Sequence, residues 1–457
     1  MVERLTALDA SFLHLEEPDT PMHVGGVLIL ETPPRGVEAL EQLVEGRLPL
    51  VPRYRQRVLV VPGHLANPVW ADDPDFDVAY HVRRSALPRP GTDAQLLDLV
   101  SRLTSRPLDR GRPLWELYLV EGLAGNRVAV VTKTHPALVD GLSAIDIGQV
   151  LLETDPDAPA PEPEVWAPRR PPSTVELLAD ALGEYVRRPS AALDTARTTV
   201  TDVRTGAARL SSVTRGLLRT ARKTVFPAPS SPLNATTGRQ RRVAVARAGL
   251  ADLKSVRKVH GGTVNDVLLT VITGALREWL LSRGEPVVGS TSVRALVPVA
   301  LQDEDGAPGG EVSSFLVDLP VGEPSPVVRL HHVSHAMREH TATGQSVGAD
   351  TLVRIGGFAP PTLHALGARA ASGFSKRIFN LVVTNVPGPQ FPLYAGGARM
   401  LATYPVVPLA DGQGLAVGVT SYDGGLFYGF NADRSALADV DVLAATVGEA
   451  FDELRVR

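Results

Sequence analysis

The alternation of hydrophobic and polar positions predicts two regions of mixed helix and strand. Aliphatic runs of strand length occur at residues 27–30, 128–131, 296–299 and 380–384. Residues 36–47 and 93–103 instead repeat their apolar side chains at the 3.6-residue spacing of amphipathic helices. The alternation stops near residue 150 and resumes near Arg242. We therefore expect an α/β protein with two α/β regions.

A different kind of sequence connects these regions. Residues 155–172 are rich in proline, which lacks a backbone donor and fixes φ, so a linker is expected. Helical spacing follows, first in the apolar stripe Val175, Leu178, Leu182 and Tyr185 and then in a second stripe within residues 209–223. The second stripe is flanked by Arg209, Arg215, Arg219, Arg222 and Lys223. A basic amphipathic helix can lie on an anionic membrane, although a solvated face is the commoner arrangement, so membrane contact through residues 209–223 is a hypothesis.

The overall composition excludes several classes of protein. The 457 residues include 46 Lys and Arg against 50 Asp and Glu, a net charge of -4, so the chain lacks the basic field that nucleic-acid binding needs. It contains no cysteine, which excludes disulfides, thiolate metal sites and a cysteine nucleophile.

No signal-peptide core is present, and the apolar runs are shorter than the roughly 18 residues of a membrane span. We expect a cytoplasmic protein, at most peripheral to the inner membrane face or to lipid droplets.

Two motifs have catalytic or metal-binding spacing in unsuitable contexts. Residues 344–348, GQSVG, match the nucleophile elbow of serine hydrolases, but a polar helical pattern precedes them instead of a strand, which favours a loop. His331, His335 and Glu339 have the spacing of metal ligands on one helix face, but a solvated face more often gives this pattern. We predict no bound metal. The sequence has no Walker or GxGxxG string, so nucleotide binding of those types is not expected.

The most informative segment is residues 133–141, KTHPALVDG. The aliphatic run at 128–131 leads directly into His135, and Asp140 and Gly141 follow before the next helical pattern. Polar residues at the end of a strand are commonly site residues in α/β proteins. We therefore expect His135 and Asp140 to lie at a functional site.

This segment resembles the HHxxxDG motif of acyl-CoA-dependent acyltransferases related to chloramphenicol acetyltransferase and to nonribosomal-peptide condensation domains. Further blocks resemble more closely the bacterial wax ester synthase/diacylglycerol acyltransferase family, and they lie at residues 5–25, 107–123, 263–277, 380–400 and 404–434. The resemblance implies two similar chloramphenicol-acetyltransferase-like α/β sandwich halves, at residues 1–154 and 241–457. It also implies that residues 155–240 form a helical connection and that a tunnel crosses the interface of the halves.

The resemblance also implies an activity. Members of the family transfer an acyl group from acyl-CoA, a co-substrate rather than a bound cofactor, to diacylglycerol or a long-chain alcohol, which gives triacylglycerol or wax esters. The family's active-site His is the general base, a role that suits imidazole because its pKa lies near working pH. Asp140 would hold the backbone around this His, with Gly141 and Asp266 in support, and the Asn265 amide would stabilise the oxyanion. Trp115 is expected to pack in the core.

The chain departs from the family motif at its central residue. The catalytic His is the second of the HH pair, where this sequence has Pro136, so His135 matches only the first. Neighbouring strand side chains point to opposite faces, so His135 can replace the base only if the backbone is rearranged next to Pro136. Three hypotheses follow: a slow acyltransferase with His135 as a rescued base, an impaired homologue that binds acyl-CoA or lipid without turnover, and altered chemistry in which water, substrate or another side chain is the base.

Overall fold

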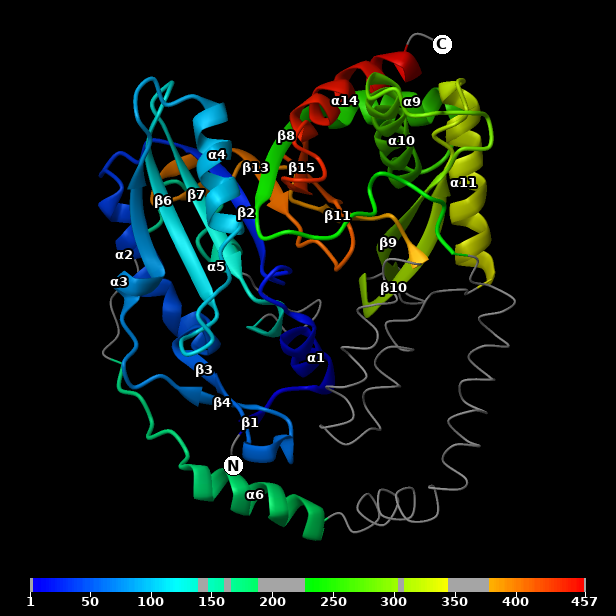
Figure 1. The fold of residues 1–457 in the computed structure, drawn as a ribbon. Helices are drawn as coiled ribbons and strands as arrows, with labels where there is room; N and C mark the ends of the chain where they lie inside the picture. The colour runs from blue at the N-terminus through cyan, green and yellow to red at the C-terminus, as the bar shows by residue number, and fades with distance from the viewer. Residues whose placement is uncertain are drawn as a thin grey trace, which may run out of the picture.

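The protein contains two α/β halves, each with a six-stranded sheet (Figure 1). The computed structural model describes residues 3–138, 147–159, 166–187, 227–302, 308–343 and 378–455. The predicted α/β class with two sheet-rich halves is confirmed. Within the described ranges, no helix is both long enough and apolar enough to cross a membrane.

The sheet of the N-terminal half has the strand order β12-β13-β2-β7-β6-β5. Its strands are β2 (Val24–Glu31), β5 (Val82–Ala86), β6 (Trp115–Leu123), β7 (Arg127–Thr134), β12 (Tyr394–Ala395) and β13 (Ala398–Val406). Strands β6 and β7 are almost entirely buried, as expected for aliphatic strands covered on both faces. Strands β12 and β13 come from the C-terminal part of the chain, so a boundary at residue 241 does not separate the two sheets.

Helices and a small second sheet surround this N-terminal sheet. The helices are α1 (Ala7–Leu15), α2 (Glu38–Arg47), α3 (Val78–His81), α4 (Asp93–Thr104) and α5 (Ile147–Val150), with 3₁₀ helices η1 (Leu48–Leu50), η2 (Pro52–Arg55), η3 (Pro62–His64) and η4 (Pro136–Leu138). The small sheet pairs β1 (Glu3–Arg4), β4 (Val69–Asp72) and β3 (Gln56–Leu59). Helix α4 begins where Thr92 and Gln95 form a reciprocal capping box. Helices α2 and α4 confirm the helices predicted from periodicity.

The sheet of the C-terminal half has the order β10-β9-β11-β14-β15-β8. Its strands are β8 (Arg241–Gly249), β9 (Val293–Gln302), β10 (Pro308–Leu319), β11 (Leu381–Pro387), β14 (Leu415–Tyr422) and β15 (Gly425–Asp433). Four helices gather on its outer side in Figure 1: α9 (Leu250–His260), α10 (Val264–Ser282), α11 (Pro326–Thr343) and α14 (Val440–Arg455). Helix α10 is apolar around most of its circumference, which matches its burial between the sheet and the other helices.

Part of the predicted connection is helical. Helix α6 (Thr174–Arg187) lies at the edge of the molecule in Figure 1. Its buried side chains include Leu177 and Ala181, whereas Val175 and Leu182 of the predicted apolar stripe are exposed. The part of the stripe formed by Val175 and Leu182 therefore faces away from the packed side of the helix. The basic segment 209–223 and the GQSVG string lie outside the described residues.

The two halves meet where α4 lies along β8, the edge strand of the C-terminal sheet (Figure 1). The backbone N–H groups of Arg241 and Val243 donate to the hydroxyls of Ser105 and Ser101, both at 2.8 Å. Four helical residues rise about 6.0 Å and two strand residues about 6.6 Å, so the spacing of the hydroxyls matches that of the donors. Each hydroxyl also donates to a carbonyl of its own helix. Helix side chains thus close the edge of β8.

We predict that replacing both Ser101 and Ser105 by Ala destabilises the protein, because two backbone donors of β8 lose their acceptors at the seam. Both hydrogen bonds are part-buried. Each contributes about 0.5–1.5 kcal/mol, so the free energy of unfolding should fall by about 1–3 kcal/mol in urea denaturation. Ser255→Ala is the matched control, because the Ser255 hydroxyl donates to the Asp252 carbonyl of its own exposed helix face. A double variant as stable as this control would contradict the role assigned to the serines.

Candidate active site

The strand β7 ends immediately before the motif residues His135 and Pro136. The His135 N–H donates to the Leu114 carbonyl at 2.9 Å, and the Leu138 N–H donates to the His135 carbonyl at 2.9 Å. Pro136 is the first residue of η4, a position that suits proline because no N–H is required and φ is near the value that the ring imposes. His135 is completely buried, whereas Pro136 is partly exposed.

The His135 side chain is a neutral imidazole with a defined tautomer. Its Nδ1 atom accepts a hydrogen bond from the Ala137 N–H at 3.1 Å, so the proton of the neutral ring lies on Nε2. Burial lowers the pKa of His135 to about 4, against the opposing charge of Glu16 and with a further lowering from Arg110. Within the described ranges, the buried Nε2 atom has no hydrogen-bond partner. This arrangement makes His135 a potential donor and leaves it no free lone pair with which to accept a proton.

A second buried histidine, His23, lies beside His135. His23 precedes Val24, which pairs with Thr134, the residue before His135. Burial lowers the pKa of His23 well below its usual range, and the charges of Lys133, His135 and Arg241 add to the shift. Both histidines are therefore neutral near pH 7, and a protonated ring at either position would be disfavoured. His23 was not identified from the sequence, because its proximity to His135 arises from strand pairing.

A buried ion pair between Lys133 and Glu116 lies near the end of β7. The Lys133 Nζ atom lies 3.0 Å from a Glu116 carboxylate oxygen and also donates to the Arg106 carbonyl at 2.9 Å. The Tyr118 hydroxyl donates to the same carboxylate at 2.8 Å, and Arg83 lies 3.4 Å from it. Burial lowers the pKa of Lys133, although Glu116 opposes the shift. The network ties β7 to β6 and to the segment that follows α4.

Trp115 packs in the core as predicted. Its indole Nε1–H donates to the Tyr54 carbonyl at 2.7 Å, and its ring stacks on His81 with 4.7 Å between the ring centroids. Both side chains are fully buried. Trp115 therefore fixes the start of β6, the strand that pairs with β7.

The start of α10 is held by Asp266, predicted from the family resemblance as a supporting residue of the motif. The Thr263 hydroxyl accepts from the Asp266 N–H at 3.1 Å, and the Asp266 carboxylate accepts from the Thr263 N–H at 2.8 Å. This capping box satisfies two of the helix's free donors. The same carboxylate accepts from the Ser334 hydroxyl of α11 at 3.0 Å. Asp266 thus fixes the first turn of α10 in a buried setting.

Asn265 lies in that first turn and is oriented by a second asparagine. The Asn385 side-chain amide of β11 donates to the Asn265 Oδ1 atom at 3.2 Å. This contact uses the acceptor of Asn265 and leaves its NH₂ group to donate elsewhere. The N-terminal end of a helix also carries a partial positive charge, which favours a negative group nearby. In the sequence, Asn385 stands out only as a polar residue in an otherwise largely aliphatic strand. Its contact with Asn265, 120 residues away along the chain, cannot be identified from the sequence.

The candidate residues occupy both halves of the molecule. His135 and Pro136 follow β7 in the N-terminal half, and Asn265 and Asp266 begin α10 in the C-terminal half. No hydrogen bond links the two groups among the residues that the structure describes. Asp140 and Gly141 lie outside those residues, so their roles remain predictions.

The alternative histidine cluster lies on an exposed helix face. His335 Nε2 is 3.5 Å from Glu339 Oε1, and both side chains are about two-thirds exposed. No group of metal-ligating side chains is found in the described part of the chain. His331 is also exposed, so all three side chains of this pattern lie on a solvated helix face.

Comparison with family models assigns the chain to an acyltransferase class. Residues 5–268 match the wax ester synthase/diacylglycerol acyltransferase catalytic domain, and residues 309–455 match the C-terminal domain of the same proteins. The chain therefore belongs to the wax ester synthase/diacylglycerol acyltransferase family. This result confirms the resemblance inferred from the sequence blocks.

Individual relatives agree with this assignment. The chain is 51% identical over 260 residues to tgs3, a probable diacylglycerol O-acyltransferase of Mycobacterium tuberculosis H37Rv. The aligned region covers 56% of this chain and 96% of that protein. It is 36% identical to the probable diacylglycerol O-acyltransferase tgs2 of the same strain, over 98% of this chain and 97% of that protein.

Two solved structures share the fold. The wax ester synthase/diacylglycerol acyltransferase from Marinobacter aquaeolei VT8 superimposes with a TM-score of 0.71, at 28% identity and 99% coverage of both chains. The starter condensation domain of rhizomide synthetase RzmA superimposes with a TM-score of 0.56 at 15% identity, covering 100% of this chain and 94% of that chain. The second comparison supports the fold alone.

We predict that His135 makes stability depend on pH. The pKa of His135 is about 4 in the folded state and about 6.5 in the unfolded state, so the unfolded state binds a proton more readily. The full free energy of unfolding is therefore present above pH 6.5, and part of it is lost as the pH falls towards 4. Between pH 7.5 and pH 5.0, wild-type protein should lose about 2 kcal/mol more of its free energy of unfolding than His135→Gln. Urea denaturation at both pH values measures this difference. Equal losses would show that His135 is not buried as a neutral ring.

Proposed function

We propose that this protein transfers the acyl group of an acyl-CoA to the hydroxyl of diacylglycerol or of a long-chain alcohol. Membership of the acyltransferase family gives the reaction class. The observation that carries the proposal is the Asn265–Asn385 contact, because it engages the oxygen of Asn265 and leaves the side-chain NH₂ group to donate at the start of a long helix. Such a donor suits the oxyanion that forms during acyl transfer.

In the proposed reaction, the acceptor hydroxyl oxygen attacks the thioester carbonyl carbon. The carbonyl oxygen becomes an oxyanion that the Asn265 NH₂ group stabilises, and collapse of this intermediate breaks the carbon–sulfur bond. The ester and the CoA thiolate are the products. The proton lost by the hydroxyl must finally reach the thiolate, either directly or through water. In family members with two histidines, the second His would carry this proton.

Because Pro136 stands at the position of the general base, we expect this chain to perform the reaction slowly. A positioned general base contributes about 10² to 10⁴ in rate, equivalent to about 3–5 kcal/mol of barrier. His135 is poorly suited to replace it, because the Ala137 N–H occupies its lone pair and burial holds its pKa near 4. Water or the leaving thiolate would then accept the proton. Orientation of the substrates and oxyanion stabilisation do not need the base, so part of the rate enhancement would remain.

A second candidate function is binding of acyl-CoA or lipid without turnover. The same two observations favour it: a proline at the base position and a His135 ring without an available acceptor. In this alternative, the scaffold of the site is retained and the chemical step is lost. The two candidates differ in whether wild-type protein forms any ester above the uncatalysed background.

The acceptor substrate also implies contact with a lipid surface. Diacylglycerol and long-chain alcohols reside in membranes or lipid droplets, so the enzyme must reach them there. We propose that the basic segment 209–223 supplies this contact, since five cationic side chains flank its apolar stripe. The exposed Val175 and Leu182 of α6 would add apolar area to the same connection.

We predict that Pro136→His raises ester formation by at least two orders of magnitude. Histidine readily adopts the helical φ of η4, so the substitution should restore the base without disturbing the backbone. Purified protein with radiolabelled acyl-CoA and diacylglycerol gives the rate of ester formation. Pro136→Gln is the control, because it releases the same backbone restraint but supplies no base. A rate for Pro136→His no higher than that of Pro136→Gln would contradict an intact active site.

We predict that Asn265→Ala, made in the Pro136→His protein, lowers kcat by about 10² to 10³, because an oxyanion donor is lost. Asn385→Ala should cause a smaller loss, since it removes only the contact that orients Asn265. Glu278→Ala, later on the same helix, is the control for nonspecific effects on α10. Losses no larger than that of the control would exclude Asn265 from the reaction.

A further inference from the structure

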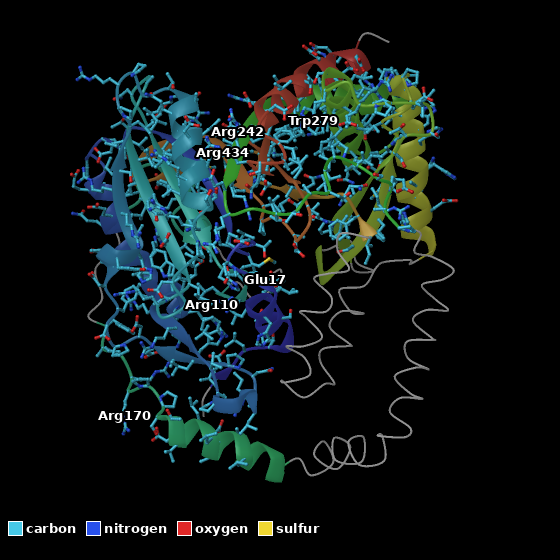
Figure 2. All side chains as sticks on the ribbon, viewed as in Figure 1. Glu17, Arg110, Arg170, Arg242, Trp279 and Arg434 are labelled. Carbon is cyan, nitrogen blue, oxygen red and sulfur yellow. The ribbon has the colours of Figure 1, made fainter. Side chains whose placement is uncertain are left out.

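A cavity of about 840 Å³ lies at the seam of the two halves, beside the Ser101 and Ser105 contacts with β8. Five arginines line it, Arg102, Arg106, Arg241, Arg242 and Arg434, and we refer to this cavity as the arginine pocket. Figure 2 shows Arg242 and Arg434 close together beside β8. Among the described residues that line the pocket, Asp98 is the single carboxylate. The residues that line the pocket therefore carry a net positive charge in a nearly neutral protein.

Two of the five arginines take part in holding the fold. Arg241 is buried, lies 3.7 Å from the Asp433 carboxylate and donates to the Asp19 carbonyl at 2.6 Å. Arg242 lies 3.2 Å from the Asp441 carboxylate. The partners of these two arginines neutralise much of their charge.

The other three arginines have no such partners. Arg102, Arg106 and Arg434 are exposed, and in the described part of the chain no carboxylate lies within ion-pair distance of their guanidinium groups. Arg102 also lies in the last turn of α4, where a cation compensates the helix carbonyls. Arg106 and Arg434 have no comparable role. Like charges around one cavity repel one another, and a bound anion would relieve this repulsion.

The backbone positions of Arg106 and Arg434 are fixed from both halves. The Arg106 carbonyl accepts from the buried Lys133 ammonium at 2.9 Å. The Arg434 N–H donates to the Gln240 carbonyl at 3.0 Å, next to Arg241. A ligand that contacts both guanidinium groups would thus bridge the N-terminal and C-terminal halves at a site whose backbone is already held in place.

The chemistry of the pocket matches a phosphorylated ligand larger than inorganic phosphate. Guanidinium groups bind phosphate oxygens through two parallel hydrogen bonds, and a cavity of this volume accommodates a nucleotide-sized molecule. The pocket also lies close to the candidate active site. Its buried wall residue Arg241 acts electrostatically on His23, which neighbours His135 across β2 and β7.

We propose that the arginine pocket binds the 3′-phosphate and diphosphate groups of the CoA nucleotide, with Arg106 and Arg434 as the principal ligands. This proposal rests on the proposed use of acyl-CoA as the acyl donor. The pantetheine arm would then extend from the seam towards the end of β7. The nucleotide would be recognised by charge, separately from the acyl chain.

The test compares binding of CoA, dephospho-CoA and pantetheine by calorimetry in wild-type protein and in the double variant Arg106→Gln/Arg434→Gln. We expect the variant to bind CoA at least tenfold more weakly and to lose the preference for CoA over dephospho-CoA. Arg257→Gln/Lys258→Gln removes the same charge from the exposed face of α9 and should bind CoA like the wild type. Thermal unfolding of the double variant should be unchanged, because neither arginine has an ion-pair partner in the described structure.

Each outcome separates this proposal from the proposed function. Unchanged CoA binding in the double variant would overturn the assignment of the pocket and leave acyl-CoA dependence intact. Failure of the wild type to bind CoA at all would instead reject the donor substrate and, with it, this site. Co-sedimentation with phosphatidylglycerol vesicles tests the other source of phosphate: loss of vesicle binding without loss of CoA binding would make the pocket a lipid-headgroup site and overturn the proposal.

Discussion

Where α4 crosses β8, the Ser101 and Ser105 hydroxyls occupy the positions that carbonyls of a neighbouring strand would otherwise take. This contact fixes α4 against the C-terminal sheet. The residue after Ser105 is Arg106, whose carbonyl accepts from Lys133 of β7, two residues before His135. Hydrogen bonds at both ends of the short backbone segment from Ser105 to Arg106 therefore link the C-terminal sheet to the end of β7. The position of the candidate site relative to the other half depends on these hydrogen bonds.

The buried carboxylate of Glu116, near the end of β7, is paired with positive charge and with a hydrogen-bond donor. Glu116 receives Lys133 and the Tyr118 hydroxyl, with Arg83 nearby, so the single carboxylate is fully surrounded by donors. The neighbouring histidines, in contrast, are kept neutral mainly by burial, to which the charge of Lys133 adds at His23 and the charge of Arg110 adds at His135. This environment supports the strand end structurally but discourages proton uptake there.

Local periodicity was sufficient to predict α2, α4 and the central strands, because each pattern is set by burial of one face or of both faces within a single element. The family resemblance located Pro136, Asn265 and Asp266. The sequence could not identify His23 or Asn385, since their partners are brought close by strand pairing and by helix–strand packing. The tautomer of His135 also depends on the turn that places the Ala137 N–H against its ring. Asp140, Gly141 and the basic segment remain predictions.

The pairing of β13 with β2 has a consequence for the order in which the chain acquires its structure. Met400 pairs with Leu30 and Val406 with Gly25, so the N-terminal sheet lacks two of its strands, β12 and β13, until nearly the whole chain has been synthesised. Until then, one edge of β2 exposes unpaired backbone groups on an aliphatic strand, the kind of edge that recruits other chains. The nascent N-terminal half is therefore an incomplete folding unit, and its native sheet can close only after translation has passed β13.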